Sequence, residues 1–280
     1  MLGSEEFDVV LNFIGFTPAE VEADIGLFGG RVGQYLFISS ATVYAKPPRV
    51  LPLTEEAPLG NPIWDYAQMK LDCERRLQRA HAGQGFPATI IRPSHTFGRR
   101  WIPNPVSSGN FAFPARIEQG KPVFIPDDGS TLWTLTAASD FAAAVAGLVG
   151  LDRAVGEAFH ITSDEALPWS RIYEEIAGAL GVELPPVVQV PSEFICEVAP
   201  SLTGTLLGDK AHPAVFDNAK IKRFVPGWEC RKSVREALEE SVSWLRRHPA
   251  ERAVDPELGE LIERVIERWR ECGGMRGRCR

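Results

Sequence analysis

Three apolar runs separated by helical patterns constrain the fold of this chain most strongly. The runs are Phe7–Ile14, Tyr35–Ser40 and Ala88–Pro93. Between the first two lies Thr17-Pro-Ala-Glu20, a capping box that predicts the start of a helix. A second helix is predicted over residues 62–82 by apolar residues at three- and four-residue spacing. Continuous apolar strands that alternate with helices build parallel sheets covered on both faces. We therefore predict an α/β fold with a doubly wound parallel sheet.

The second predicted helix carries a tyrosine and a lysine on one face. Asn61 is expected to cap it and Pro62 to take its first position. Tyr66 and Lys70 are then one turn apart, and an ammonium beside a phenol lowers the pKa of a tyrosine from its usual ~10. Ser40, at the end of the preceding strand, is placed to hydrogen-bond the same substrate oxygen. Because Tyr-x-x-x-Lys alone occurs by chance on many helices, the prediction depends on this combination.

The block Ser39-Ser40-Ala41-Thr42-Val43-Tyr44, followed by Tyr66-x-x-x-Lys70, resembles the extended short-chain dehydrogenases, the NAD-dependent epimerase/dehydratase family. The resemblance implies a Rossmann-like fold, NAD or NADP as cofactor, and a substrate with a hydroxyl or carbonyl group, of which nucleotide-sugars are one class. It implies that the catalytic residues are Ser40, Tyr66 and Lys70. It further implies cofactor contacts from Ile14, Gly15, Ser39, Tyr66, Lys70, Pro93 and His95.

The roles assigned to His95 and to the pair Arg99 and Arg100 each have an alternative explanation. His95 lies in a segment similar to one that passes the nicotinamide in the family, and the alternative is a loop histidine hydrogen-bonded to backbone. Arg99 and Arg100 are predicted, with Ser40, to bind substrate, because guanidinium groups suit phosphate. The alternative for this arginine pair is plain exposure to solvent.

The family's Gly-x-x-Gly-x-x-Gly turn, which binds the pyrophosphate of the cofactor, does not occur in the 280 residues. Gly26, Gly29, Gly30 and Gly33 follow a predicted helix and precede a strand, so we expect them to end the helix and form a loop. By the resemblance, the first strand corresponds to the fourth of the family. We therefore expect an N-terminally truncated domain. Either its apolar edge is covered by a second copy or a partner, or the sequence is an incomplete gene product.

Two regions are expected along the chain. Residues 1–98 are predicted to form the remaining half of a Rossmann-like domain, with the catalytic helix. Residues 99–280 are predicted to form mostly a smaller C-terminal substrate lobe, with segments near 131–163 returning to the Rossmann-like core.

The composition excludes several classes of protein. A net charge of −7 argues against a general binder of nucleic acid or anionic membranes, and the basic ending Arg276–Arg280 is expected to be a solvated tail. The five cysteines form no C-x-x-C pair, so neither a disulfide framework nor a zinc site is predicted, and a reducing cytoplasm is expected. Histidines 81, 160, 212 and 248 lack metal spacing and receive no role. No uncharged apolar stretch approaches the ~20 residues of a membrane span.

Three functions follow from these observations. The first is an NAD(P)-dependent epimerase/dehydratase-like oxidoreductase that acts on a small molecule. The second is a non-catalytic or RNA-binding atypical member of the family, related to chloroplast RNA-binding proteins, for which Leu132–Thr136 gives a loose similarity. The acidic composition counts against this second function. The third is a chain that keeps the active-site residues and binds the cofactor too weakly to use it.

Overall fold

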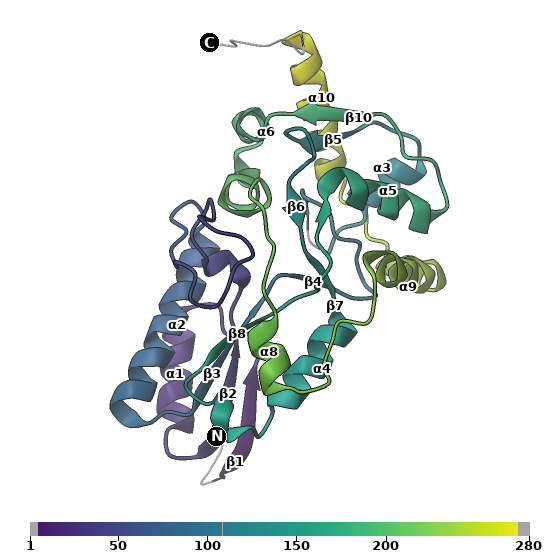
Figure 1. Ribbon diagram of the computed structural model, residues 1–280. Coiled ribbons are helices and arrows are strands. Elements are labelled where there is room, and N and C mark those ends of the chain that lie inside the picture. Colours follow the sequence, from purple (N-terminus) through teal and green to yellow (C-terminus); the bar gives the residue numbers. More distant parts are fainter. Residues whose placement is uncertain (1–4, 108, 274–280) are drawn as a thin grey trace. The chain divides into compact units, whose positions relative to one another are not determined.

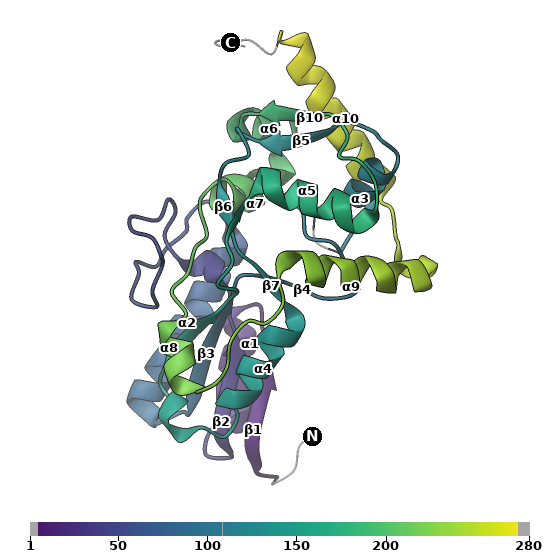
Figure 2. The same ribbon diagram turned by 45° about the vertical axis from the view of Figure 1, so that its right-hand side comes forward.

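The structure, a computed structural model, describes residues 5–107 and 109–273, which form two compact units (Figures 1 and 2). The first unit comprises the chain up to Thr96, together with residues 138–164 and 216–231. The second comprises residues 97–137, 165–215 and the chain from Lys232 onward. The sequence predicts a return to the first unit near 131–163, but it does not indicate the return at 216–231. The two units have similar lengths, whereas the sequence predicts a smaller second lobe. The basic ending Arg276–Arg280 lies outside the described residues.

The first unit is built on a four-stranded parallel sheet. Its strands are β1 (Phe7–Asn12), β2 (Val32–Ile38), β3 (Ala88–Pro93) and β8 (Ala158–Ile161), in the order β1-β2-β3-β8. One face is covered by α1 (Pro18–Phe28) and α2 (Asp65–Gln84), and the other by α4 (Ala138–Leu148) and α8 (Ala219–Phe224) (Figure 1). The short helices η1 (Ala41–Val43) and η2 (Asp152–Ala154) complete this unit. This arrangement confirms the predicted doubly wound parallel sheet.

The side chains of β2 alternate between two hydrophobic cores. Tyr35 and Phe37 pack with α1 and α2, whereas Leu36 and Ile38 pack with α4 and α8. All four are buried, as expected for a strand covered on both faces. The core therefore holds the carboxyl end of β2, and the serines that follow it, at a fixed position in the sheet.

The helix ends agree with the sequence in part. Thr17 and Glu20 form the predicted capping box of α1, and Gly85, with a φ of 69°, ends α2 in the left-handed conformation. The predicted start of α2 is wrong: the helix begins at Asp65, and Asn61 does not cap it. The Asn61 side chain instead donates a hydrogen bond to the Thr42 carbonyl at 3.0 Å. This contact fastens the end of the long 45–60 loop to η1.

The second unit contains two short sheets and most of the remaining helices. Strand β5 (Val123–Pro126) pairs in parallel with β10 (Val187–Val190), and β6 (Leu132–Trp133) pairs antiparallel with β9 (Leu167–Pro168). The helices of this unit are α3 (Ala112–Glu118), α5 (Trp169–Leu180), α6 (Ser192–Val198), α7 (Thr203–Thr205), α9 (Val234–Arg247) and α10 (Pro256–Glu271). The shorter elements of this unit are β7 (Leu135–Ala137), η3 (Pro200–Leu202), η4 (Leu206–Lys210) and η5 (Pro249–Glu251). The division between the two units falls within β4 (His95–Phe97). None of the described helices is long and apolar enough to cross a membrane.

Candidate active site

The predicted site residues of the first unit follow the carboxyl ends of three adjacent strands. Asn12 of β1 lies opposite Phe37 of β2, and Ile38 lies opposite Ile91 of β3. The chain leaves all three strands at the same edge of the sheet, which is where ligands bind in open α/β folds. Ile14, Gly15, Ser39, Ser40 and Pro93 all lie at or just beyond this edge, and His95 follows Pro93 by two residues. The structure thus groups the residues that the sequence predicts for the cofactor.

Lys70 points inward and joins two of these strand ends. Its ammonium donates hydrogen bonds of 2.8 Å to the carbonyl oxygens of Gly15 and Ile38, and the side chain is 2% exposed. The rings of Phe16 and Phe37 lie 4.6 and 4.9 Å from Nζ. Burial lowers the pKa of Lys70 from 10.5 to about 8, although nearby acidic groups oppose the shift. The helix carrying Tyr66 is thereby tied to the ends of both β1 and β2.

Tyr66 and Ser40 complete the predicted catalytic set. Tyr66 is half-buried one turn before Lys70, and its ring centroid lies 5.9 Å from Nζ. Ser40 is buried and caps η1: its Oγ accepts hydrogen bonds from the Thr42 amide at 3.2 Å and the Thr42 hydroxyl at 2.9 Å. Because both contacts use Ser40 Oγ as an acceptor, its own proton remains available to donate to a substrate oxygen.

Ser39 is bound inside the protein by residues that sequence reasoning missed. Its hydroxyl donates to Glu74 Oε1 at 2.5 Å, and the cofactor contact expected from Ser39 stays a prediction. Glu74 is completely buried and forms an ion pair with Arg92 of β3, with 2.7 Å between Oε2 and Nη2. A second contact of 3.0 Å joins Arg92 Nε to Glu74 Oε1, so the pairing is bidentate. Burial lowers the pKa of Arg92, but the ion pair with Glu74 more than offsets this and leaves it raised.

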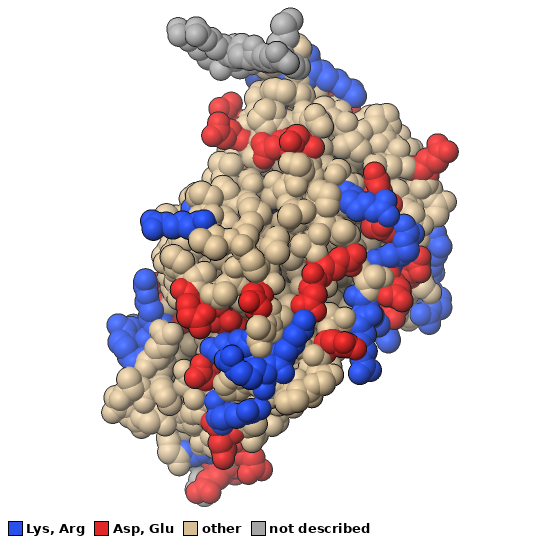
Figure 3. Space-filling view, viewed as in Figure 1, with Lys and Arg blue, Asp and Glu red and all other residues tan. Residues whose placement is uncertain are grey.

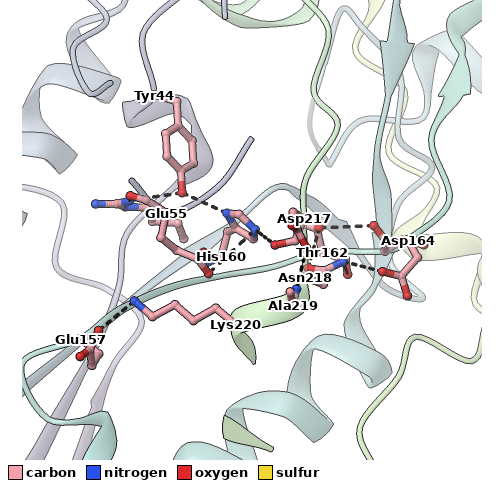
Figure 4. A network of polar contacts seen from close by, with 12 residues as sticks. Tyr44, Glu55, Glu157, His160, Thr162, Asp164, Asp217, Asn218, Ala219 and Lys220 are labelled. Atoms are coloured by element: carbon pink, nitrogen blue, oxygen red, sulfur yellow. Dashed lines mark hydrogen bonds and ion pairs between the residues drawn. The ribbon is translucent and has the colours of Figure 1, made fainter. Parts of the chain in front are cut away.

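A chain of hydrogen bonds continues from Arg92 to β8, and Figure 4 shows its part from Tyr44 through His160 to Asp217. Arg92 Nη1 lies 3.2 Å from the Tyr44 hydroxyl, which lies 3.0 Å from Nδ1 of His160. His160 Nε2 lies 2.7 Å from the carbonyl oxygen of Asp217. Since a carbonyl only accepts, Nε2 carries the proton and Nδ1 accepts from Tyr44. Burial lowers the pKa of His160 to about 4, so the ring is neutral near pH 7.

The 45–60 loop enters the same network through Glu55 (Figure 4). The Glu55 carbonyl accepts from Arg92 Nη1 at 3.2 Å, and its carboxylate accepts from the His160 amide at 3.2 Å. Burial raises the pKa of Glu55. Two sequence signals pointed to this network: Glu74 lies one turn beyond Lys70, and His160 interrupts an apolar strand. Neither signal identifies its partner.

Arg99 and Arg100 lie in the second unit, beside α9. Both are exposed, and the Arg100 guanidinium lies 6.0 Å from the Trp244 ring. Arg99 lines an open cavity of about 710 Å³ with Lys232, Glu236, Glu239, Glu240, Ser243 and Arg247. Acidic and basic groups are mixed there, and the substrate role of the two arginines stays a prediction.

The edge of the sheet at β1 differs from the buried network. A surface cavity of about 400 Å³ runs along β1 and α1, lined by Val10, Leu11, Asn12, Ile14, Gly15, Glu20, Ala23, Asp24 and Phe28. Hydrogen bonds from two backbone amides lower the pKa of Glu20, so this carboxylate faces the cavity ionised. Several large apolar side chains of the same region are exposed, namely Leu11, Phe13, Ile14 and Phe16.

Comparison with known proteins places this arrangement in a family. Residues 27–161 match the family model of the NAD dependent epimerase/dehydratase family, a span that includes Ser40, Tyr66, Lys70, Glu74 and Arg92. The chain carries a domain of that family. This match supports the family and the NAD(P)-dependent oxidoreductase class that the sequence predicts.

Two curated relatives and one solved structure describe the similarity further. The chain is 29% identical over 271 residues to 2'-dehydrokanamycin reductase of Streptomyces kanamyceticus, which covers 96% of this chain and 74% of the reductase. It is 30% identical over 194 residues to the chloroplast stem-loop binding protein of 41 kDa b of Arabidopsis thaliana, covering 69% of this chain and 48% of that protein. The epimerase Mth375 of Methanothermobacter thermautotrophicus has the same fold, with a TM-score of 0.71, 18% identity and coverage of 87% of this chain and 73% of the epimerase.

Proposed function

We propose that this epimerase/dehydratase chain is an NAD(P)-dependent oxidoreductase that interconverts a hydroxyl and a carbonyl group on a carbohydrate-like small molecule. The observation that carries the proposal is the buried Lys70 ammonium, fixed to the ends of β1 and β2 one helical turn from Tyr66. The relative named as 2'-dehydrokanamycin reductase favours a sugar ketone as the substrate. A nucleotide-sugar is the second substrate class in this proposal.

The residues at the strand ends fit the nicotinamide half of a dinucleotide. Two of the three N–H donors of the Lys70 ammonium bind the Gly15 and Ile38 carbonyls. Among the described contacts of Lys70, the third donor can bind a ribose hydroxyl. When bound, the dinucleotide supplies or accepts the hydride. The cavity beside β1 is acidic and does not suit a pyrophosphate. Since no Gly-x-x-Gly-x-x-Gly turn is present either, we expect NAD+ and NADP+ to bind this chain with Kd values of about 1 mM or weaker.

The chain's own groups divide the proton chemistry among them. Tyr66 donates a proton to the substrate oxygen during reduction and removes it during oxidation. Ser40 donates its hydroxyl proton in a hydrogen bond to the same oxygen, because its Oγ is already an acceptor for Thr42. The Lys70 ammonium stabilises the phenolate that forms on Tyr66. Phe16 and Phe37 keep water away from that ammonium.

Turnover of a sugar ketone tests this function. NADPH and NADH at several millimolar are mixed with 2'-dehydrokanamycin or a nucleotide 4-keto sugar, and coenzyme consumption is followed by absorbance. We expect oxidation of at least one coenzyme by the wild-type chain and a fall in kcat of about 10²- to 10⁴-fold for Tyr66→Phe. Tyr173→Phe, which removes a buried hydroxyl of the second unit, should keep the wild-type rate. Equal rates for wild type and Tyr66→Phe would exclude the proposed role of Tyr66.

RNA binding is the second candidate, and the name of the chloroplast relative is what favours it. The surface around α8 shows acidic and basic side chains side by side (Figure 3). Lys220 pairs with Glu157 at 2.8 Å and Lys222 with Asp164 at 2.8 Å, so these positive charges are already neutralised. We therefore expect no shift of a stem-loop RNA in a gel at about 150 mM salt. A shift that weakens steeply with added salt would favour this function.

A polypeptide partner at the edge of the sheet belongs to the same proposal. β1 is an edge strand of the described sheet, and exposed apolar side chains follow it. Such an edge is a template for pairing with another chain. We expect a second copy of this chain to cover this edge.

The cytoplasmic location of the protein stays a prediction.

A further inference from the structure

Ser40 lies within a short segment, Ser39–Tyr44, whose two ends are held by one ion pair. At the first end, Glu74 accepts the hydrogen bond of the Ser39 hydroxyl at 2.5 Å. At the other end, Arg92 donates to the Tyr44 hydroxyl at 3.2 Å. Glu74 is 0% and Arg92 is 2% exposed, so water does not compete for these contacts. Loss of the ion pair therefore removes one side-chain contact at each end of the segment.

Glu74 also fixes α2 against β2. Tyr66, Lys70 and Glu74 are spaced four residues apart and share one face of α2. Lys70 binds the carbonyl of Ile38, and Glu74 binds the side chain of Ser39, the next residue of the strand end. Two attachment points one helical turn apart oppose sliding of the helix along the strand. The position of Tyr66 relative to Ser40 is set by these two contacts.

The far side of the ion pair is equally constrained. The bidentate contact fixes the plane of the Arg92 guanidinium against Glu74. Tyr44 is held by Arg92 on one side and by His160 on the other, and His160 is held in turn by the Asp217 carbonyl. The segment is thus connected to β3, β8 and α2 together.

A buried ion pair of this kind is a poor way to gain stability. Removing two charges from water costs several kcal/mol each, and apolar residues of similar volume often stabilise a protein as well or better. What the pair supplies here is directed contact with two hydroxyls at the ends of the Ser40 segment. Its geometry therefore suits positioning more than it suits stability.

We propose that Glu74 and Arg92 are positioning residues, whose ion pair immobilises the segment Ser39–Tyr44 and thereby keeps the Ser40 hydroxyl aligned with Tyr66 and Lys70. The alignment of Ser40 for chemistry depends on the proposed oxidoreductase function. The immobilisation of the segment does not depend on it.

Amide hydrogen exchange followed by mass spectrometry tests the immobilisation on the chain without ligand. Ser39→Ala and Tyr44→Phe each remove one hydroxyl, and Glu74→Gln removes the charge. We expect exchange in peptides that cover residues 39–44 to become about tenfold faster or more in each variant. Glu175→Gln, a buried carboxylate with two arginine partners in the second unit, is the matched control and should leave these peptides unchanged. If Glu74→Gln does not fold, the two hydroxyl variants decide the test.

Exchange within about twofold of wild type in the folded variants overturns the immobilisation, since loss of a hydrogen bond to a charged group should change opening by more than this. That result would not touch the proposed function, which has its own turnover test.

Kinetics with NADPH and 2'-dehydrokanamycin test the positioning. We expect Ser39→Ala to lower kcat about tenfold or more while the KM for NADPH stays within about threefold, because Ser39 acts through Ser40 and not on the coenzyme. Ser39→Thr keeps the hydroxyl and should restore kcat. A kcat of Ser39→Ala equal to wild type, despite faster exchange, overturns the positioning role. If wild type itself turns over no ketone, the proposed function fails, and the exchange experiment still decides the immobilisation.

Discussion

The carboxyl end of the sheet differs from one strand to the next. At the carboxyl ends of β2, β3 and β8, polar side chains are buried and joined into one network that runs from Ser39 through Glu74, Arg92 and Tyr44 to His160. Beyond β1, the side chains are apolar and exposed, with Ile14 78% accessible to solvent. The polar network is held by contacts within the protein. The apolar side chains beyond β1 are open to solvent and available for contact with a ligand or another chain.

This difference indicates that the two regions have different roles, one in catalysis and one in association. A closed network holds catalytic groups in place before a ligand arrives, and such preorganisation is what lowers a reaction barrier. An exposed apolar edge offers backbone and side chains for association, beside the cofactor contact that is predicted for Ile14. We expect substitutions in the network to change stability and rate, and substitutions at the β1 edge to change assembly.

The largest effect should come from breaking the buried ion pair. Arg92→Ala leaves the Glu74 carboxylate buried without its partner, so we expect the free energy of unfolding to fall by about 3–5 kcal/mol. Urea unfolding measures this value. Arg76→Ala removes the exposed pair with Glu22 and should cost less than about 1 kcal/mol. If the free energy of unfolding fell by a similar amount in both variants, the buried ion pair would matter no more for stability than an exposed one.

Lys70 connects the two regions and should give a pH signature. Its folded pKa of about 8 lies below 10.5, so between these values the unfolded chain holds more protons and stability rises with pH. The free energy of unfolding of wild type, measured relative to Lys70→Met, should therefore increase from pH 8 to pH 10. Below pH 8 the difference between the two proteins should be constant. A difference that shrinks as pH rises would contradict the buried position of this ammonium.

The smallest effect on stability should come from the β1 edge. Ile14→Asp replaces a highly exposed side chain, so the free energy of unfolding of the separated chain should change by no more than about 0.5 kcal/mol. If a second copy covers this edge, light scattering should give a single-chain mass for the variant and a larger mass for wild type. Equal masses for both proteins would leave the edge without the proposed partner.

The sequence predicted the features that depend on local pattern. Apolar runs gave the strands β1, β2 and β3, the capping box gave the start of α1, and four-residue spacing placed Tyr66 and Lys70 on one face of α2. The inward direction of Lys70 follows from the same spacing, because that face of the helix packs on the sheet.

The failures come from contacts between residues far apart in the chain. Asn61 is a residue type that often caps helices, yet α2 begins only at Asp65 and the Asn61 amide binds the Thr42 carbonyl. His160 lacks metal spacing and received no role, yet Tyr44 and Asp217 make it a buried link of the network. The return of residues 216–231 to the first unit had no signal, since it is fixed by tertiary packing of Ile221 and Trp228.

A crystal structure with a dinucleotide and a sugar ketone measures the central claim most directly, through the position of one substrate oxygen. We expect this oxygen to lie within about 3.2 Å of both Ser40 Oγ and Tyr66 Oη, with Lys70 Nζ hydrogen-bonded to a ribose hydroxyl. A substrate oxygen bound elsewhere, with the Tyr66 hydroxyl directed away from Ser40, would contradict the assignment of these residues to proton transfer.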